Sequence, residues 1–177
     1  EAIEMLTHLS MFFRTALSKG EDVISLFDEV LHTKSYLEIQ QIRYSDILEY
    51  SIDLPEEFEM ISLPKLTLQP LVENALYHGV KEKRGQSKIT ITFEDAGDDI
   101  VIQVLDDGIG MTEERLQEVK EGLKQNNNVG FGLAAVQGRL VLYFGAGYGI
   151  DIWSKYGEGT RIRVRIPKKF NFLDKKI

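Results

Sequence analysis

Three short motifs in a fixed order restrict the folds open to this chain more than any other feature of its sequence. They cover residues 71–78, 106–111 and 130–133. The first places an Asn within a helical apolar pattern, the second places two Asp and two Gly directly after a strand pattern, and the third places two Gly before an apolar helix. Each motif is weak alone, but an amide, a carboxylate and paired glycines in this order can together hold one magnesium nucleotide.

The composition excludes several classes of protein. The chain has 177 residues, of which 43% are hydrophobic and 28% charged, which suits one globular domain with an appendage. A net charge of −7 argues against a general nucleic-acid binder, which needs a basic face. The absence of Cys excludes disulfides and thiolate metal sites and is compatible with a reducing cytosol. No apolar run reaches the roughly 18 residues of a membrane span, and no signal peptide is visible.

The first part of the chain is expected to be helical. Apolar residues at three- and four-residue spacing predict a helix over residues 1–19 that ends at Gly20. A second helix is expected from Ser25, whose hydroxyl can cap it, to about Arg43. These helices cannot bury all their apolar side chains on one another, so they need a partner helix or chain, or they dock on the domain that follows. The chain begins at Glu1 rather than Met, which suggests a processed or excised fragment.

Strands and helices are both expected in the remainder of the chain. Alternating patterns predict strands over residues 46–54, 88–94, 99–105, 149–154 and 160–166. Helical patterns run from Pro64 to about Gly79 and from about Leu133 to near Gly145. A hairpin turn is expected at 95–98, and the polar stretch 112–129 is expected to contain a loop at 124–128. Because strands and helices do not alternate strictly, the pattern predicts an α+β fold with helices on one face of a mainly antiparallel sheet.

Asn74 and His78 are the candidate polar residues of the first motif. They are four residues apart and share one face of the expected helix. The amide oxygen of Asn74 is a suitable ligand for Mg²⁺, which keeps several waters and takes its other ligands from phosphate and a few hard oxygens. A carboxylate at this position would repel a triphosphate. Taken alone, the same pattern also describes an ordinary polar helix face.

Asp106 and the two glycines after it suit the recognition of a base. A carboxylate at a strand end accepts a hydrogen bond from the amino group of adenine, whereas guanine presents a carbonyl oxygen there. The mismatch costs roughly 1–3 kcal/mol. Gly108 and Gly110 let the backbone turn sharply and approach a ring without a Cβ. A plain Asp-Gly turn is the alternative interpretation.

The third motif is suited to phosphate. Free amides and the positive dipole end at the helix start after Gly130 and Gly132 favour an anion, and residues 126–128 would form a mobile lid. The sequence has no Walker loop and no Rossmann fingerprint. Thr160, at the start of the last expected strand, could place a hydroxyl or a bridging water beside a base.

With these segments together, the chain resembles the superfamily of gyrase, heat-shock chaperone, histidine kinase and mismatch-repair ATPases, whose nucleotide-binding fold is the Bergerat fold. It is most similar to sensor histidine kinases of the LytS/YesM-like group. Residues 68–75, followed by His78 and Gly79, resemble the N box of that group, and the second and third motifs resemble its two glycine boxes. The resemblance covers residues 45–168.

The resemblance implies a two-layer α/β sandwich that binds Mg-ATP and passes its γ-phosphoryl group to a histidine. By analogy, Asn74 holds Mg²⁺, Asp106 reads adenine, and His78 lies near phosphate or ribose. Gly108 and Gly110 are implied to shape the base pocket, and Thr160 is implied to lie near the base. Gly130, Gly132 and Leu133 are implied to belong to the lid over phosphate.

The resemblance also implies a domain organisation and partners. Residues 1–44 resemble the second dimerisation helix and its connection, residues 45–170 the ATP-binding catalytic domain, and residues 171–177 are a tail. The implied partners are an upstream phosphoacceptor helix of the same protein, a response regulator and a second copy in a full-length homodimer. The implied location is the cytoplasmic part of a membrane-anchored bacterial protein.

The sequence departs from the family pattern at two places. The phosphoacceptor His of the group lies in an Asn-Pro-His-Phe setting, which neither His8 nor His32 has, so both are interpreted as ordinary helix residues and the acceptor is expected upstream of Glu1. The usual Asn after the second glycine box is replaced near Ala134 and Ala135, which removes a polar contact there.

Two alternatives within the superfamily are a hydrolytic or conformational ATPase and a serine kinase. Those families place a Glu four residues before the N-box Asn to activate water or a hydroxyl. Pro70 occupies this position and can do no proton chemistry, which favours a histidine kinase. Glu73, next to Asn74, could assist by polarising the incoming histidine. A non-catalytic binding module is disfavoured because Asn74 and Asp106 are intact.

Overall fold

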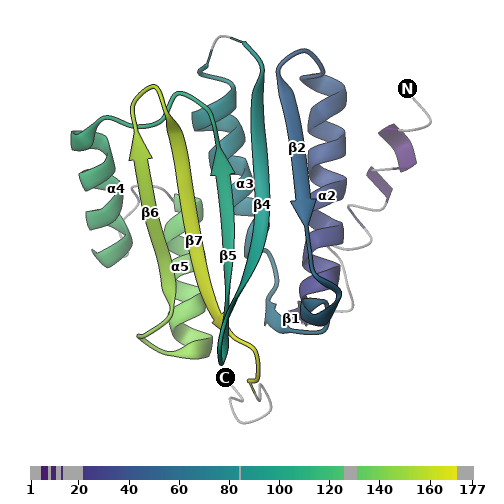
Figure 1. Ribbon diagram of the computed structural model, residues 1–177, viewed down its shortest axis with the longest axis vertical. Helices are drawn as coiled ribbons and strands as arrows, with labels where there is room; N and C mark the ends of the chain where they lie inside the picture. The colour runs from purple at the N-terminus through teal and green to yellow at the C-terminus, as the bar shows by residue number, and fades with distance from the viewer. Residues whose placement is uncertain are drawn as a thin grey trace.

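A five-stranded sheet forms one layer of the molecule (Figure 1). The computed structural model describes residues 5–7, 9, 10, 13, 22–83, 85–125 and 131–170. The strand order is β2-β4-β5-β7-β6, in which β2 and β4 are parallel and every other pair is antiparallel. The strands are β2 (Leu48–Asp53), β4 (Ser87–Ala96), β5 (Asp99–Asp106), β6 (Gly149–Lys155) and β7 (Gly159–Pro167).

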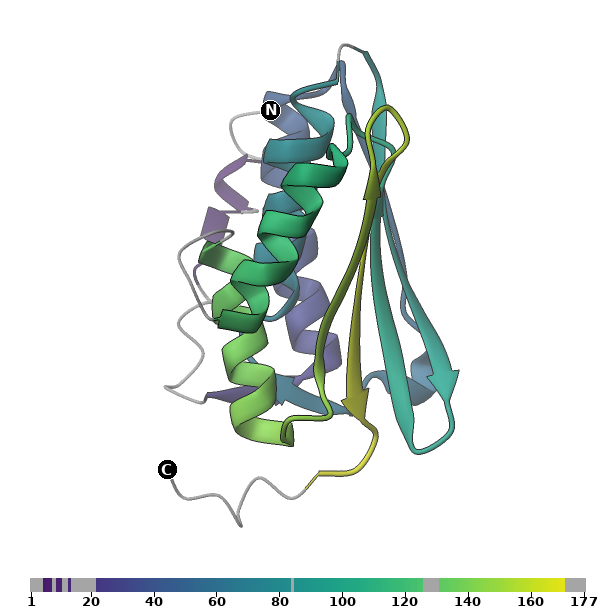
Figure 2. The same ribbon diagram turned by 90° about the vertical axis from the view of Figure 1, so that its left-hand side faces the viewer.

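Helices form the second layer, against one face of this sheet (Figure 2). They are α2 (Leu26–Arg43), α3 (Leu68–Asn74), its π-helical continuation η2 (Ala75–Val80), α4 (Glu113–Gln125) and α5 (Phe131–Phe144). The short 3₁₀ turn η1 (Glu56–Phe58) follows β2. This arrangement confirms the predicted α+β fold. Within the part of the chain that the structure describes, no helix has the length and apolar character needed to cross a membrane.

The hydrophobic core lies between the two layers. Alternate residues of β4, β5 and β7 point inward and are fully or almost fully buried, which is the pattern expected of strands with one covered face. Each fully buried Leu, Ile or Val contributes about 1.5–3 kcal/mol relative to an exposed position. The inward residues include Ile89, Ile91, Ile102, Val104, Ile162 and Val164, and they face Leu71, Val72, Val136 and Leu140 of the helices.

The helix predicted from Ser25 is confirmed. Ser25 is the N-cap of α2, and its hydroxyl oxygen accepts a hydrogen bond from the backbone N–H of Asp28 at 3.1 Å. The strands predicted on either side of the 95–98 turn are also confirmed, and they extend until only residues 97 and 98 remain in the turn, with Gly97 at φ 78°. Of the helix predicted over residues 1–19, the structure describes only residues 5–7, 9, 10 and 13, and these are helical.

The prediction that Pro64 opens a helix is wrong. Pro64 ends the short strand β3 (Ser62–Pro64), which pairs antiparallel with β1 (Val23–Ser25). The helix begins four residues later, because the Glu29 carboxylate of α2 accepts hydrogen bonds from the backbone N–H groups of Leu66 and Leu68. This carboxylate supplies the acceptors that the first turn of a helix lacks. It lies 39 residues away from Leu68 in the sequence, so no local pattern announces it.

The polar stretch 112–129, in which the sequence predicts a loop at 124–128, is mostly helix α4 over its described residues. Three apolar residues in the stretch, Leu116, Val119 and Leu123, form one buried stripe. Thr112 supports the first turn, since its hydroxyl accepts from the backbone N–H of Arg115 at 3.3 Å. Because most of the other residues of α4 are charged or polar, the apolar periodicity of this stripe is weak in the sequence. Of the predicted loop, residues 124 and 125 belong to α4, and 126–128 lie outside the described residues.

Candidate functional site

A cavity of about 280 Å³ lies where the three sequence motifs meet. Asn74 and His78 come from the first motif, Gly110 and Met111 from the second, and Leu133 from the third. The structure therefore brings these predicted residues together from α3, η2, the segment after β5, and α5. The cavity wall is completed by four residues that sequence reasoning did not single out: Thr112, Arg115, Val119 and Tyr156.

A second cavity of about 270 Å³ shares Asn74, His78 and Leu133 with the first. Glu73 also lines it, which places this carboxylate on the same cavity as the Asn74 amide although the two are consecutive in the helix. Gly132 lines it from the start of α5. Gly130 lies outside the described residues.

Asp106 lies at the end of β5 and lines neither of these cavities. Its carboxylate packs against Gly79, the residue after His78, so closely that a Cβ at Gly79 would overlap with it. The Oδ1 atom accepts a hydrogen bond from the Gly108 backbone N–H at 2.9 Å. Asp106 and Thr160 line a separate hollow of about 380 Å³ beside the β6–β7 turn. Asp106 thus touches the helix of the first motif from the sheet side.

The electrostatics of Asp106 are unusual for a carboxyl group. Only 7% of the residue is exposed. Burial raises its pKa from 3.8 to about 6, while the backbone N–H groups of Gly108 and Thr160 act in the opposite direction. A buried acceptor of this kind can read a hydrogen-bond donor on a ligand, and it is costly to leave unpaired.

Close backbone packing explains why glycines surround Asp106. A Cβ at Gly108 would overlap with the Gly79 backbone, and one at Gly159 would overlap with the Asp106 carbonyl group. Gly110 has a φ of 68°, and a Cβ there would overlap with the Lys155 carbonyl group. In this structure Gly108 and Gly110 therefore serve main-chain packing. The sequence places Gly79 at a helix end and, with His78, in the resemblance to the N box, but it does not indicate the contact of Gly79 with Asp106.

A hydroxyl pair connects the last strand to the first cavity. The Ser154 hydroxyl donates to the Gly159 carbonyl at 3.0 Å and accepts from the Met111 backbone N–H at 2.9 Å. The Thr160 hydroxyl lies 2.8 Å from the same oxygen, so Thr160 is the donor in that contact because Ser154 has only one proton to give. The predicted residue Thr160 therefore acts on the cavity wall through Ser154, which sequence reasoning missed.

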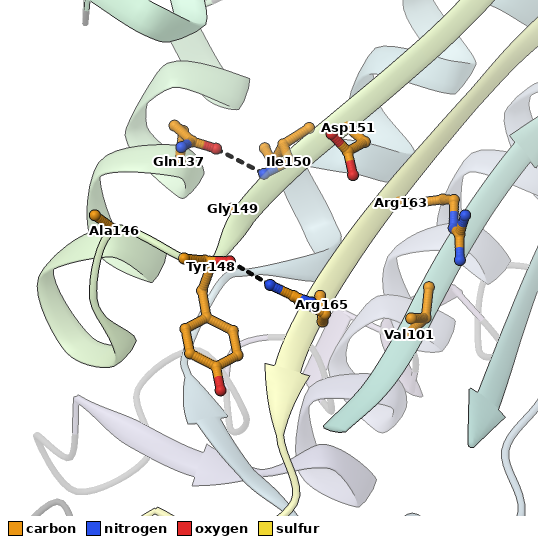
Figure 3. Close-up of a pocket in the computed structure, with 10 residues that line it drawn as sticks. Val101, Gln137, Ala146, Tyr148, Gly149, Ile150, Asp151, Arg163 and Arg165 are labelled. Carbon is orange, nitrogen blue, oxygen red and sulfur yellow. Dashed lines mark hydrogen bonds between the residues drawn. The ribbon is translucent and has the colours of Figure 1, made fainter. Parts of the chain in front are cut away.

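A larger hollow of about 470 Å³ lies away from these motifs (Figure 3). Gln137, Asp151, Arg163 and Arg165 are among its lining residues, and it contains none of the predicted site residues. Two of its polar groups are already paired within the fold: Gln137 accepts from the Ile150 backbone N–H and Arg165 donates to the Gly147 carbonyl, each at 2.6 Å. Size alone therefore does not make it the candidate site.

Metal ligands are sparse in the described part of the chain. No group of three or more His, Cys, Asp or Glu residues within it could hold a metal ion. A cation at this site would take a ligand such as the Asn74 amide oxygen and complete its shell with phosphate and water, which is the coordination Mg²⁺ prefers.

Two family models match the chain. Residues 63–169 match the model described as histidine kinase-, DNA gyrase B-, and HSP90-like ATPase, and residues 1–48 match the histidine kinase model. The chain belongs to this ATPase family. Within the family it corresponds to the ATP-binding catalytic region of sensor histidine kinases.

Curated relatives agree with this assignment. The chain is 31% identical over 169 residues to the sensor histidine kinase BtsS of Escherichia coli, covering 94% of the chain and 28% of BtsS. It is 32% identical over 164 residues to the sensor histidine kinase YesM of Bacillus subtilis, covering 93% of the chain and 27% of YesM. The kinase region described here thus spans little more than a quarter of the length of these relatives.

Solved structures share the fold. A histidine kinase domain from Erythrobacter litoralis matches with a TM-score of 0.59 at 14% identity, covering 93% of this chain and 78% of that one. The histidine kinase AdeS of Acinetobacter baumannii matches with a TM-score of 0.55 at 13% identity, covering 93% and 77%. At these identities the likeness concerns the fold of the kinase region alone.

Proposed function

We propose that this kinase region binds ATP with Mg²⁺ at the meeting point of the three motifs and transfers the γ-phosphoryl group to a histidine on an upstream helix. The observation that carries the proposal is the convergence of Asn74, His78, Gly110 and Leu133 on one cavity, with Asp106 packed against the adjoining Gly79. Motifs separated by some thirty residues in sequence share a cavity wall, which suits a ligand with a base, a sugar and phosphates.

The residues present fit a magnesium nucleotide. Asp106 is a buried acceptor suited to the adenine amino group, and Thr160 lies beside it. Asn74 offers the amide oxygen for Mg²⁺, and His78 and Arg115 offer polar or cationic groups on the same cavity. Gly130, Gly132 and Leu133 would cover the phosphates from the start of α5. Bound Mg²⁺ would neutralise the negative charge that builds up on the transferred group.

Glu73 is the proposed proton acceptor. The unprotonated nitrogen of the incoming imidazole bonds to the γ-phosphorus while the bond from this phosphorus to the bridging oxygen breaks and ADP leaves. Glu73 takes the proton from the other ring nitrogen, which leaves a neutral phosphorylated imidazole ring. Its position on the cavity that also holds Asn74 and His78 supports this role.

The proposal includes the setting of the whole protein. The histidine would lie on a phosphoacceptor helix that precedes Glu1, and residues 1–44 would continue that dimerisation region in a homodimer. A response regulator would take the phosphoryl group onward. The kinase region would be cytoplasmic in a membrane-anchored bacterial protein, and residues 45–170 would form its ATP-binding unit with a tail over 171–177. The support is the resemblance to BtsS and YesM over both family models.

A labelling experiment tests the proposal. The isolated chain should bind Mg-ATP without labelling itself from γ-labelled ATP, and it should label a supplied fragment that carries the upstream helix. The label should be labile to acid, as expected of a phosphohistidine. Self-labelling that survives acid would instead support a serine kinase, and hydrolysis without any transfer would support a conformational ATPase. Pro70, which cannot activate a hydroxyl or water, favours the first outcome.

Asn74→Asp tests the metal assignment separately. The added negative charge should weaken binding of Mg-ATP by about tenfold or more, since it lies beside the phosphates. Binding of ADP in the presence of EDTA, measured by calorimetry, should change much less. Equal magnesium-dependent affinity in the variant and the wild type would remove Asn74 from the metal site.

A further inference from the structure

A line of three side chains connects α2 to the candidate proton acceptor. His32 of α2 is 2% exposed, and its Nε2 atom lies 2.6 Å from Oε1 of Gln69 on α3. Gln69 in turn donates from Nε2 to Oε1 of Glu73 at 2.7 Å. Gln69 and Glu73 are four residues apart on one helix face, the spacing at which helical side chains meet. The line therefore ends on a carboxylate that lines the second cavity.

The chemistry of these groups allows only one direction of hydrogen bonding. An ionised carboxylate can only accept, so Gln69 must turn its amide nitrogen toward Glu73. This leaves the amide oxygen facing His32, which must then donate from Nε2. Each group fixes the orientation of the next, and the ring of His32 is held within the helical layer.

The start of α3 is fixed to α2 at a second point. Glu29 lies three residues before His32 in α2, on the same side of the helix. Its two carboxylate oxygens accept from the backbone N–H groups of Leu66 and Leu68, at 2.9 and 2.7 Å. The position of Gln69 relative to His32 therefore does not depend on the Gln69 side chain alone.

We propose that His32 and Gln69 are positioning residues for phosphoryl transfer, which hold the Glu73 carboxylate ready for the incoming imidazole. The inference rests on the proposed function, because it matters only if Glu73 accepts a proton. A free glutamate side chain samples several rotamers, and fixing one of them removes part of the entropy cost of reaching the reactive arrangement. This role differs from ATP binding, which would use Asn74 and Asp106.

The test is a set of paired variants assayed in single-turnover transfer to the supplied histidine-bearing helix, with ATP affinity measured alongside. His32→Leu and Gln69→Leu should each slow transfer by about tenfold or more, because misplaced catalytic groups lose rate on this scale. ATP affinity should stay within about twofold of the wild type, since neither side chain lines the first cavity. His32→Gln keeps a donor at a similar reach and should recover most of the transfer rate.

Ser35→Ala is the matched control. Ser35 is buried in α2, but its hydroxyl donates to the Leu31 carbonyl of its own helix at 3.0 Å, so its loss should leave transfer unchanged. The inference is overturned if both Leu variants transfer at the wild-type rate, if transfer and ATP affinity fall together, or if His32→Gln is as slow as His32→Leu. A wild-type chain that binds no ATP or transfers nothing would contradict the proposed function instead.

Discussion

Two buried carboxylates mark the two ends of the segment that carries the first motif, and they differ in what their oxygens contact. Glu29 of α2 is fully buried, and its carboxylate contacts the start of α3. Asp106 lies against Gly79, within η2. Burial raises the pKa of Glu29 from 4.5 to about 7 and that of Asp106 from 3.8 to about 6. Both groups are therefore buried, and burial shifts the pKa of each in the same direction.

Their hydrogen bonds separate them. Both oxygens of Glu29 accept from backbone N–H groups, and Leu66, which makes one of these bonds, has a φ of 58° in the left-handed region. Arg139 donates to the Leu66 carbonyl at 2.5 Å, so both backbone polar groups of Leu66 are hydrogen-bonded. Asp106 accepts from the Gly108 backbone N–H at Oδ1 within a shell of glycines, with the Thr160 backbone N–H also close, and it lines the hollow beside the β6–β7 turn. A buried carboxylate whose two oxygens are both used by the fold is a helix cap, whereas one beside a hollow can still receive a ligand.

The largest effect that tests the difference between Glu29 and Asp106 is expected on the free energy of unfolding. Glu29→Ala leaves two buried N–H groups without acceptors and should lower the free energy of unfolding by about 2–4 kcal/mol. Urea unfolding measures the loss, with Glu57→Ala at an exposed glutamate as the control. The preference for ATP over GTP should be unaffected. A changed preference in a folded variant would mean that Glu29 also acts on the ligand.

Asp106→Asn should have the opposite profile. Loss of the carboxylate should weaken ATP binding by about 1–3 kcal/mol, or roughly 5- to 150-fold, because an amide cannot accept at both positions. GTP binding, already disfavoured, should change less, and the circular dichroism spectrum should remain that of the wild type. Calorimetric titrations with both nucleotides provide the measurement. Equal ATP affinity in variant and wild type would remove the base-reading role.

The smallest expected effect is on pH dependence. The ligand contact requires the ionised form of Asp106, so ADP affinity should fall as pH decreases below about 6, by at most tenfold per unit. This fall in ADP affinity should be present in Glu29→Ala and absent from Asp106→Asn. Because the phosphates of ADP titrate in the same way with every variant, comparing the two variants removes their contribution. The same profile in all three proteins would show that Asp106 does not control it.

The free energy of unfolding should depend on pH in the opposite direction to ADP affinity. Both carboxyls have a higher pKa in the folded chain than in the unfolded one, so the fold binds their protons more tightly. The contribution of Glu29 to the free energy of unfolding is therefore greatest below pH 4.5 and is lost as pH rises to about 7. For Asp106 the corresponding interval is 3.8 to about 6.

Features set by neighbouring residues could be predicted from the sequence. Ser25 caps α2 through Asp28, three residues on, and the strands follow from alternation of apolar side chains. The start of α3 could not be predicted, because it depends on Glu29 in another element. Helix α4 was missed since only a narrow stripe around Val119 is apolar.

The site divides in the same way. The order of motifs and the family resemblance predict that Asn74 and Asp106 converge on one nucleotide; Asn74 shares a cavity with Gly110, whereas Asp106 lines a separate hollow. The contact between Asp106 and Gly79 and the bonds through Ser154 depend on which residues the folded chain places side by side, so sequence reasoning did not find them. His32 was interpreted as an ordinary helix residue, and nothing near it in the sequence indicates its contact with Gln69.

The parallel pairing of β2 with β4 has a consequence for how the molecule can be divided. All six residues of β2 pair with β4, yet β2 ends at Asp53, ten residues before the ATPase family match begins at 63. A protein trimmed to the matched segment would expose the backbone edge of β4 and leave the apolar surface beneath α2 open to water. Such an edge invites self-association. The independently soluble unit of this kinase should therefore begin before Leu26, at the N-cap of the helix that carries Glu29 and His32.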